Sequence, residues 1–264
     1  MIVDFHTHIF PDALAARAIN TLLTRAGGIF PPVTDGTRAG LLRSMDEAGI
    51  DISVTLPVIT KQSQTVTINE WAASLSSDRI VPFGGIFPHT DDYKRDIDLV
   101  VSLGLKGIKL HAEGQGFTVD DPKMLKIYDY AFERGLIILQ HAGYDPGFPP
   151  PYHTSPEKFR SIVRQMRGGV MIAAHLGGQS QWDEVEKYLV GENIYLDTSM
   201  GQKLYPKEQF LRIVKAHGAD RILFGTDSPW SSAKDEVELI SALPLSDEEK
   251  ALILSDNARR LLSI

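Results

Sequence analysis

The chain opens with two histidines whose spacing suits a metal ion. His6 and His8 follow the short apolar run Ile2–Phe5, which is long enough for one buried strand. Side chains alternate along a strand, so Asp4, His6 and His8 are expected on one face. Imidazoles at positions i and i+2 at a strand end can converge on one divalent cation. The His-x-His pattern alone is equally consistent with two polar residues where a strand enters a loop.

Further candidate metal-site residues lie at the ends of other apolar segments, where the sequence becomes polar. Taken singly, each has an ordinary explanation as a loop histidine, a turn aspartate or a surface lysine. Taken together they predict a metal site, because a barrel gathers the carboxyl ends of its strands at one face. The groups at these positions are Lys109, His111, His141, His175 and Asp227. Three other histidines lie in loops or at a helix end and are expected to be structural or solvent-exposed: His89, His153 and His217.

The elements that must position these groups alternate between strand and helix along the whole chain. Eight strands separated by helices in about 250 residues match a distorted (β/α)₈ TIM barrel with parallel strands. The alternative is an open doubly wound sheet, but no G-x-G-x-x-G motif follows the first strand. After the first strand, the expected strands are Ile52–Leu56, Arg79–Phe87, Gly107–His111, Leu136–His141, Val170–His175, Asn193–Asp197 and Arg221–Asp227.

Helix-terminal residues support this reading of the helices. Asp35 or Thr37 is expected to cap a helix that stops at Gly49. Ser246 is expected to cap a C-terminal helix over Asp247–Leu262. Because no linker, charge block or low-complexity tract interrupts the pattern, residues 1–264 are expected to form a single domain.

Composition limits the classes of function. The net charge of −7 argues against non-specific binding to nucleic acid or to an anionic membrane. The chain has no cysteine, which leaves His, Asp, Glu or a modified Lys as metal ligands. No signal peptide is visible, and no apolar run approaches the roughly 20 residues that span a bilayer. We therefore expect a cytoplasmic protein that acts on a small molecule, with a homodimer as one option.

Five stretches of the chain resemble the amidohydrolase superfamily, in particular the amidohydrolase-related branch that includes aminocarboxymuconate-semialdehyde decarboxylase. The resemblance covers essentially the whole chain and implies a distorted TIM barrel with an extra C-terminal helix and a divalent metal, commonly zinc. The stretches that carry it are Asp4–His8, Gly107–His111, Ala173–Gly178, Leu223–Trp230 and Asn257–Leu261.

The resemblance also implies roles for individual residues. It implies a single-metal ligand set of His6, His8, His141 and Asp227, with His175 acting beside the metal-bound water. In two-metal members of the superfamily, His175 would be a ligand and Lys109 would be a carboxylated bridge between the metals. Both arrangements remain open, and the expected metal is Zn²⁺, with Mn²⁺ or another first-row ion as alternatives.

These parts suggest two reactions. A bound metal with an open position lowers the pKa of water towards about 7, which creates a nucleophile or a base. Asp227 would then shuttle the proton, His175 would polarise the substrate, and an unmodified Lys109 would bind an anionic group. The first hypothesis is a hydrolase of an amide, ester or lactone bond. The alternative is a non-oxidative decarboxylase of an aromatic or unsaturated acid, although no arginine stands out as a carboxylate clamp.

The stretch Ala142–His153, rich in proline and aromatic residues, is interpreted as a stiff loop over the barrel mouth or as an ordinary surface loop. Four aromatic side chains are candidates to line a pocket there: Tyr144, Phe148, Tyr152 and Trp230. A third hypothesis, a barrel that binds a ligand without turnover, fits the intact set of candidate ligands less well.

Overall fold

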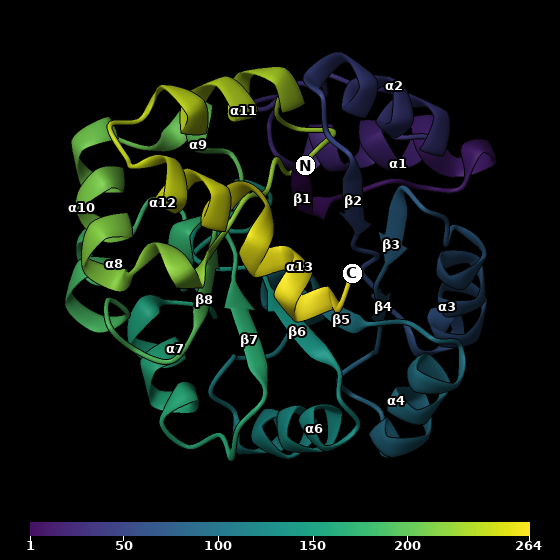
Figure 1. The fold of residues 1–264 in the computed structure, drawn as a ribbon. Helices are drawn as coiled ribbons and strands as arrows, with labels where there is room; N and C mark the ends of the chain where they lie inside the picture. Colours follow the sequence, from purple (N-terminus) through teal and green to yellow (C-terminus); the bar gives the residue numbers. More distant parts are fainter.

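The computed structural model describes residues 1–264 apart from the side chain of Gln202. Parallel strands form an inner wall and helices form an outer layer, so the predicted distorted (β/α)₈ barrel is confirmed (Figure 1). The strands are β1 Val3–Thr7, β2 Ile52–Thr55, β3 Ile80–Pro82, β4 Gly84–Gly85, β5 Gly107–Leu110, β6 Ile137–Gln140, β7 Val170–Ala173, β8 Tyr195–Asp197 and β9 Ile222–Leu223.

The strands hydrogen-bond in sequence order in two groups, β1 to β3 and β4 to β9. The predicted strand Arg79–Phe87 is divided between them, because β3 pairs with β2 whereas β4 pairs with β5. On the opposite side, the backbone N–H of Phe5 donates to the carbonyl of Phe224, and that of Asp227 donates to the carbonyl of His6, both at 2.8 Å. The first strand is thereby joined to the segment that follows the last.

Helices cover the outside of this wall, and the expected caps are present in part. Thr37, rather than Asp35, caps α2 by accepting from Gly40 N–H. Ser246 caps α12, but a π-helical turn at Leu252–Asp256 interrupts the single helix expected there. The helices are α1 Asp12–Arg25, α2 Arg38–Ala48, α3 Thr65–Ser74, α4 Tyr93–Ser102, α5 Ala112–Gln115, α6 Pro122–Glu133, α7 Pro156–Val163, α8 Trp182–Tyr188, α9 Gly201–Leu204, α10 Lys207–His217, α11 Ala233–Ala242, α12 Asp247–Ala251 and α13 Asn257–Leu262. Within the described residues, none of these helices combines the length and hydropathy that crossing a membrane requires.

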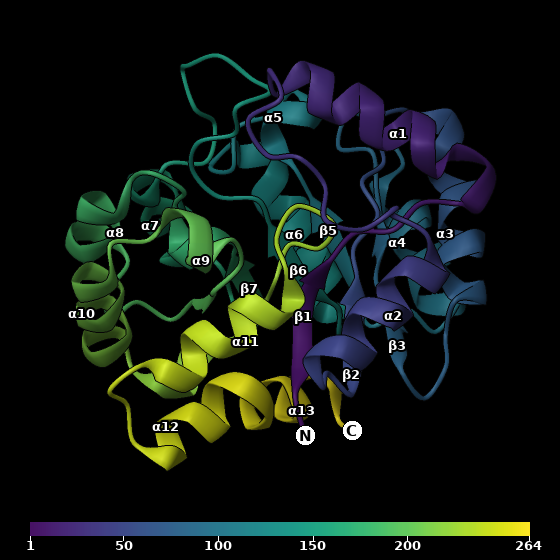
Figure 2. The same cartoon turned by 90° about the horizontal axis from the view of Figure 1, so that it is seen from above.

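An inner hydrophobic cluster fills the barrel from the end where the strands begin. It gathers side chains of β1, β2, β6, β7 and β9, with Phe5 packed edge-on against Phe83. Helix α13 adds Ala258 and Leu262 to this cluster and lies across that end of the barrel (Figure 1). Figure 2 shows α13 and both termini at one end of the molecule and α5 at the other. The carboxyl ends of the strands are therefore left to carry the functional groups.

We expect α13 to stabilise the barrel through this contact. Leu262 is 1% exposed, so Leu262→Ala should lower the free energy of unfolding by about 2–5 kcal/mol, measured by urea denaturation. The matched control is Leu14→Ala on α1, where the side chain is 53% exposed and the loss should stay within about 0.5 kcal/mol. An equal loss of unfolding free energy in both variants would show that the contact of α13 with the barrel does not stabilise the fold.

Candidate metal centre

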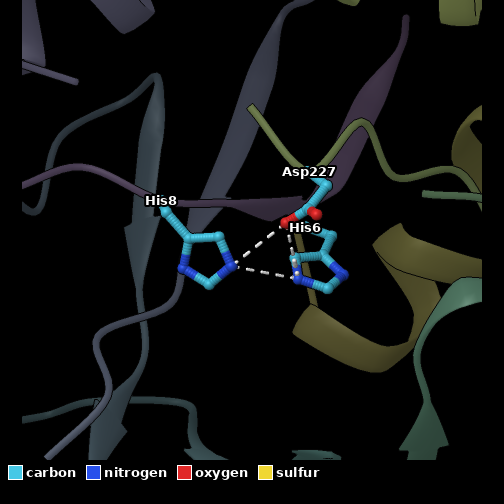
Figure 3. A group of neighbouring side chains, drawn as sticks. All are labelled: His6, His8 and Asp227. Atoms are coloured by element: carbon cyan, nitrogen blue, oxygen red, sulfur yellow. Dashed lines mark hydrogen bonds and ion pairs between the residues drawn. The ribbon is translucent and has the colours of Figure 1, made fainter. Parts of the chain in front are cut away.

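Three of the predicted metal-binding side chains lie together at the carboxyl ends of the strands. His6 Nε2 lies 3.2 Å from His8 Nε2. Asp227 Oδ1 lies 3.3 Å from His6 Nε2 and 3.2 Å from His8 Nε2 (Figure 3). His6 and His8 belong to the end of β1, and Asp227 belongs to the loop after β9. The three groups form the arrangement that a divalent cation requires of two imidazoles and a carboxylate.

An irregular strand end produces this convergence. The register of β1 with β2 shifts after Asp4, which is typical of a β-bulge. A side chain at Gly225 would place its Cβ 2.9 Å from His6 Cβ, so only glycine lets the two segments approach this closely. Asp227 has φ of +64°, a left-handed conformation that a non-glycine residue adopts only when its surroundings enforce it.

Asp4 does not join the cluster, contrary to the expectation that it would share a face with His6 and His8. Its carboxylate accepts hydrogen bonds from the hydroxyl of Thr226 at 2.7 Å and from the backbone N–H groups of Thr226 and His6. Burial raises the pKa of Asp4 to about 7, although these hydrogen bonds act in the opposite direction. Asp4 therefore ties β1 to the β9 side of the barrel.

Hydrogen bonds to the far ring nitrogens fix the tautomers of the two histidines. His6 Nδ1 lies 2.8 Å from Asp197 Oδ2, and His8 Nδ1 lies 2.7 Å from the carbonyl oxygen of Leu56. A carboxylate and a carbonyl can only accept, so each Nδ1 carries the hydrogen and each Nε2 presents a lone pair. The Nε2 lone pairs of His6 and His8 thus face the Asp227 oxygen, and a cation between them would stabilise this arrangement.

His141 and His175 form a second chain of hydrogen bonds behind this cluster. The Ser199 hydroxyl donates to Asp197 Oδ1, so it accepts from His175 Nδ1 at 2.8 Å. His175 Nε2 must then accept from His141 Nδ1 at 3.2 Å. His141 Nε2 is consequently a lone pair, and it is buried with no hydrogen-bond partner among the described residues. An orphaned neutral imidazole nitrogen is suited to a metal.

The structure does not place His141 within the group of His6, His8 and Asp227. Ligand-type atoms of His141 lie within 4.8 Å of those of His111 and Asp145, which form a separate group. His141 stacks on His111, with ring centroids 4.3 Å apart. The four-ligand set expected from the sequence is thus present as three clustered residues, with His141 linked to their surroundings through His175.

Charges in the site are set mainly by burial. Lys109 is 1% exposed, its Nζ lies 3.0 Å from His6 Nε2, and burial lowers its pKa to about 8. Burial, followed by the charge of Lys109, lowers the pKa of His6 to about 4. Burial opposes ionisation of Asp227, but His6 and His8 outweigh it and hold the pKa of that carboxyl below its ordinary value. At neutral pH the site therefore combines a neutral His6 imidazole, the Asp227 carboxylate and a largely protonated Lys109 amine.

Asp197 is the site residue that the sequence interpretation missed. It ends β8, and its carboxylate contacts His6 Nδ1 through Oδ2 and the backbone N–H groups of His175 and Ser199 through Oδ1. Burial alone would raise its pKa, but the interactions with His6 and His175 lower it. The signal was available, because Asp197 ends an apolar run in the same way as Asp227.

The remaining histidines and the predicted pocket residues lie outside the His6, His8 and Asp227 cluster. His89 Nε2 and His217 Nε2 bond to the backbone carbonyls of Gln115 and Ile194, as structural histidines do. Among the predicted pocket residues, Tyr144 packs against Tyr152 with ring centroids 5.7 Å apart, and Phe148 packs against His111. Trp230 stands in the loop after β9, three residues beyond Asp227, and its backbone carbonyl accepts from Lys203 Nζ.

The family model described as Amidohydrolase matches residues 3–264. The chain therefore belongs to the amidohydrolase family, as its sequence motifs suggested. No curated protein matches the sequence.

Solved structures share the fold over the whole chain. An uncharacterised TIM-barrel protein from Bordetella bronchiseptica is 22% identical, with a TM-score of 0.80 and coverage of 99% of this chain and 98% of that chain. A dihydroxybenzoic acid decarboxylase from Polaromonas sp., with bound manganese and 2-nitroresorcinol, is 16% identical, with a TM-score of 0.73 and coverage of 99% and 96%. A manganese-bound 5-carboxyvanillate decarboxylase from Novosphingobium aromaticivorans is 14% identical, with a TM-score of 0.75 and coverage of 100% and 97%.

Asp197→Asn tests the support that this carboxylate gives to the cluster. Loss of the charge leaves His6 Nδ1 and the Ser199 hydroxyl with a weaker acceptor, so the affinity for Mn²⁺ or Zn²⁺ should fall by about 10- to 100-fold. Calorimetric titration of metal into the metal-free protein measures this. The control is Asp78→Asn, an exposed carboxylate before β3, which should bind metal as the wild type does. Unchanged affinity in Asp197→Asn would remove this residue from the site.

Proposed function

We propose that the protein is a metal-dependent non-oxidative decarboxylase of an aromatic or unsaturated carboxylic acid. The observation that carries this proposal is the buried amine of Lys109, which lies 3.0 Å from His6 Nε2 beside the ligand cluster. The Lys109 amine can bind a substrate carboxylate, a role for which the sequence showed no suitable arginine. Further support comes from decarboxylases of hydroxylated aromatic acids, whose structures share this fold over at least 99% of the chain.

We assign the metal to His6, His8 and Asp227, with His141 Nε2 as the fourth donor. The fit rests on the lone pairs described above and on the orphaned, buried His141 Nε2. Neutral imidazoles with a carboxylate suit Mn²⁺ as well as the Zn²⁺ first expected, and manganese is present in both decarboxylase structures. When bound, such an ion holds and polarises the oxygen atoms of the substrate.

The remaining steps belong to side chains of this chain. Lys109 Nζ binds the carboxylate that is to leave. The bond between that carboxylate and the ring breaks, carbon dioxide departs, and the electron pair stays on the ring carbon, which then takes one proton. We assign Asp227 to take that proton from solvent and pass it to the carbon, with His175 beside it as the second catalytic residue.

A second candidate is hydrolysis of an amide, ester or lactone bond, the first hypothesis from the sequence. It is favoured by the description of the family model, Amidohydrolase, and would use the same ligands. A carboxylated Lys109 bridging two metals, with His175 as a ligand, belongs to this second candidate.

Product analysis separates the two reactions. Protein loaded with Mn²⁺ or Zn²⁺ would be incubated with dihydroxybenzoates, 5-carboxyvanillate, lactones and anilides, while carbon dioxide and proton NMR spectra are followed. Carbon dioxide with a ring proton in place of the carboxylate supports the decarboxylase. A new carboxylate with an amine or alcohol supports the hydrolase. One metal per chain by plasma mass spectrometry agrees with the four-donor site, whereas two would make Lys109 a bridging carbamate.

Asp227→Asn should lower kcat on an identified substrate by at least about 100-fold, because the amide cannot relay a proton. Some metal should remain bound through His6 and His8. Steady-state kinetics and metal content of the same preparation measure both effects, with Asp78→Asn as the surface control. Full activity in Asp227→Asn would show that another residue supplies the proton.

A further inference from the structure

His111 stands at the corner between β5 and α5, where both of its ring nitrogens are occupied. It caps α5, because the backbone N–H of Gly114 donates to His111 Nδ1 at 3.1 Å. Its Nε2 lies 2.9 Å from Asp145 Oδ2. Since Nδ1 accepts, the hydrogen must be on Nε2, and it is donated to the Asp145 carboxylate. The ring is therefore held by a hydrogen bond at each nitrogen.

His111, His141 and Asp145 form a group of potential metal ligands. Their ligand-type atoms lie within 4.8 Å of one another, so distance alone would allow a second metal ion. A neutral histidine binds a metal through a lone pair, and the only lone pair of His111 is used by the Gly114 N–H. Turning the ring to its other tautomer would place two N–H donors against each other at that cap.

Asp145, the partner of His111, lies in the first half of the loop over residues 142–153. Asp145 is mostly buried, and its Oδ1 accepts from the backbone N–H of Gly147, which folds the loop back on itself. Burial would raise the pKa of Asp145, but the hydrogen bond from His111 outweighs it and lowers that pKa. The carboxylate thus stays ionised and accepts a charge-assisted hydrogen bond.

The same corner also holds the far end of the loop. Glu113 in α5 accepts from the backbone N–H of His153 and from the hydroxyl of Thr154, both at 2.9 Å. Between these anchors, Phe148 packs against the His111 ring, and the Arg25 guanidinium at the end of α1 lies 5.1 Å from the Phe148 ring centre. Figure 2 shows α1 and α5 on the same side of the molecule, away from α13.

We propose that His111 is a positioning residue that fixes the 142–153 loop at the mouth of the barrel through its Nε2–H bond to Asp145. Its ring also supports His141, on which it stacks. The loop is then a rigid wall that presents its aromatic side chains in one arrangement. This role does not depend on whether the enzyme decarboxylates or hydrolyses, because it concerns the shape of the mouth.

Two substitutions separate the two contacts of His111. In His111→Asn, a side-chain oxygen close to the position of Nδ1 keeps the cap on α5, but the side chain is too short to reach Asp145. In His111→Gln, the longer amide still donates to Asp145, but the hydrogen bond that caps α5 is lost. Hydrogen exchange of residues 145–148, followed by mass spectrometry, should be about tenfold faster or more in His111→Asn and in Asp145→Ala. His111→Gln should restore protection close to that of the wild type.

A nitrogen NMR spectrum of the histidines tests the tautomer in the wild-type chain, so the outcome does not rest on variants that fail to fold. The His111 signals should show hydrogen on Nε2, before and after Zn²⁺ is added. The number of metal ions per chain should be the same in wild type, His111→Asn and Asp145→Ala.

Three results would overturn the proposal. One is loss of the Nε2–H signal of His111 on addition of zinc. The second is the loss of one metal equivalent in either variant, which would make the group a metal site. The third is unchanged exchange of residues 145–148 in His111→Asn. None of these measurements uses activity, so their failure is distinguishable from failure of the proposed reaction.

Discussion

The candidate site depends on the contact that joins the first strand to the segment after the last. The backbone of Phe5 bonds to Phe224, and that of Asp227 bonds to His6, which brings residues more than 200 positions apart into register. Gly225 permits the close approach, and the strained backbone of Asp227 aims its carboxylate at the histidines. The cluster therefore requires β1 to lie against the segment that follows β9.

Hydrogen bonds around the site determine which histidine nitrogens keep a lone pair for a cation. Asp197 receives hydrogens from both the His6 side and the Ser199 side, and the order of donors along each path leaves a lone pair on Nε2 of His6 and of His141. The Nε2 of His175 instead accepts from His141, and the Nδ1 of His111 accepts from the Gly114 N–H. The five histidines at the strand ends are thus divided into His6, His8 and His141, which we assign to a cation, and two rings whose lone pair already accepts a hydrogen from a backbone group or another ring. Distance alone does not make this distinction.

The sequence predicted the barrel and most strand ends because apolar runs and helix signals repeat regularly along the chain. It failed at Asp4, since a face assignment by alternation assumes a regular strand and a bulge breaks that regularity. Asp197 was missed because an aspartate at the end of a strand is also an ordinary turn or capping residue, although its run ends like that of Asp227. The separation of His141 from His6 and His8 was beyond reach, because it depends on how side chains stack across neighbouring strands rather than on their order.

Both chain ends lie at the same end of the molecule as helix α13 (Figure 2). Met1 and Ile264 are each largely open to solvent, and the loop at the mouth is on the opposite side (Figure 2). This geometry favours circular permutation, in which a linker joins residues 1 and 264 and new ends open in an outer loop. It also means that a fused protein or a solid support attached at the base would leave the entrance unobstructed.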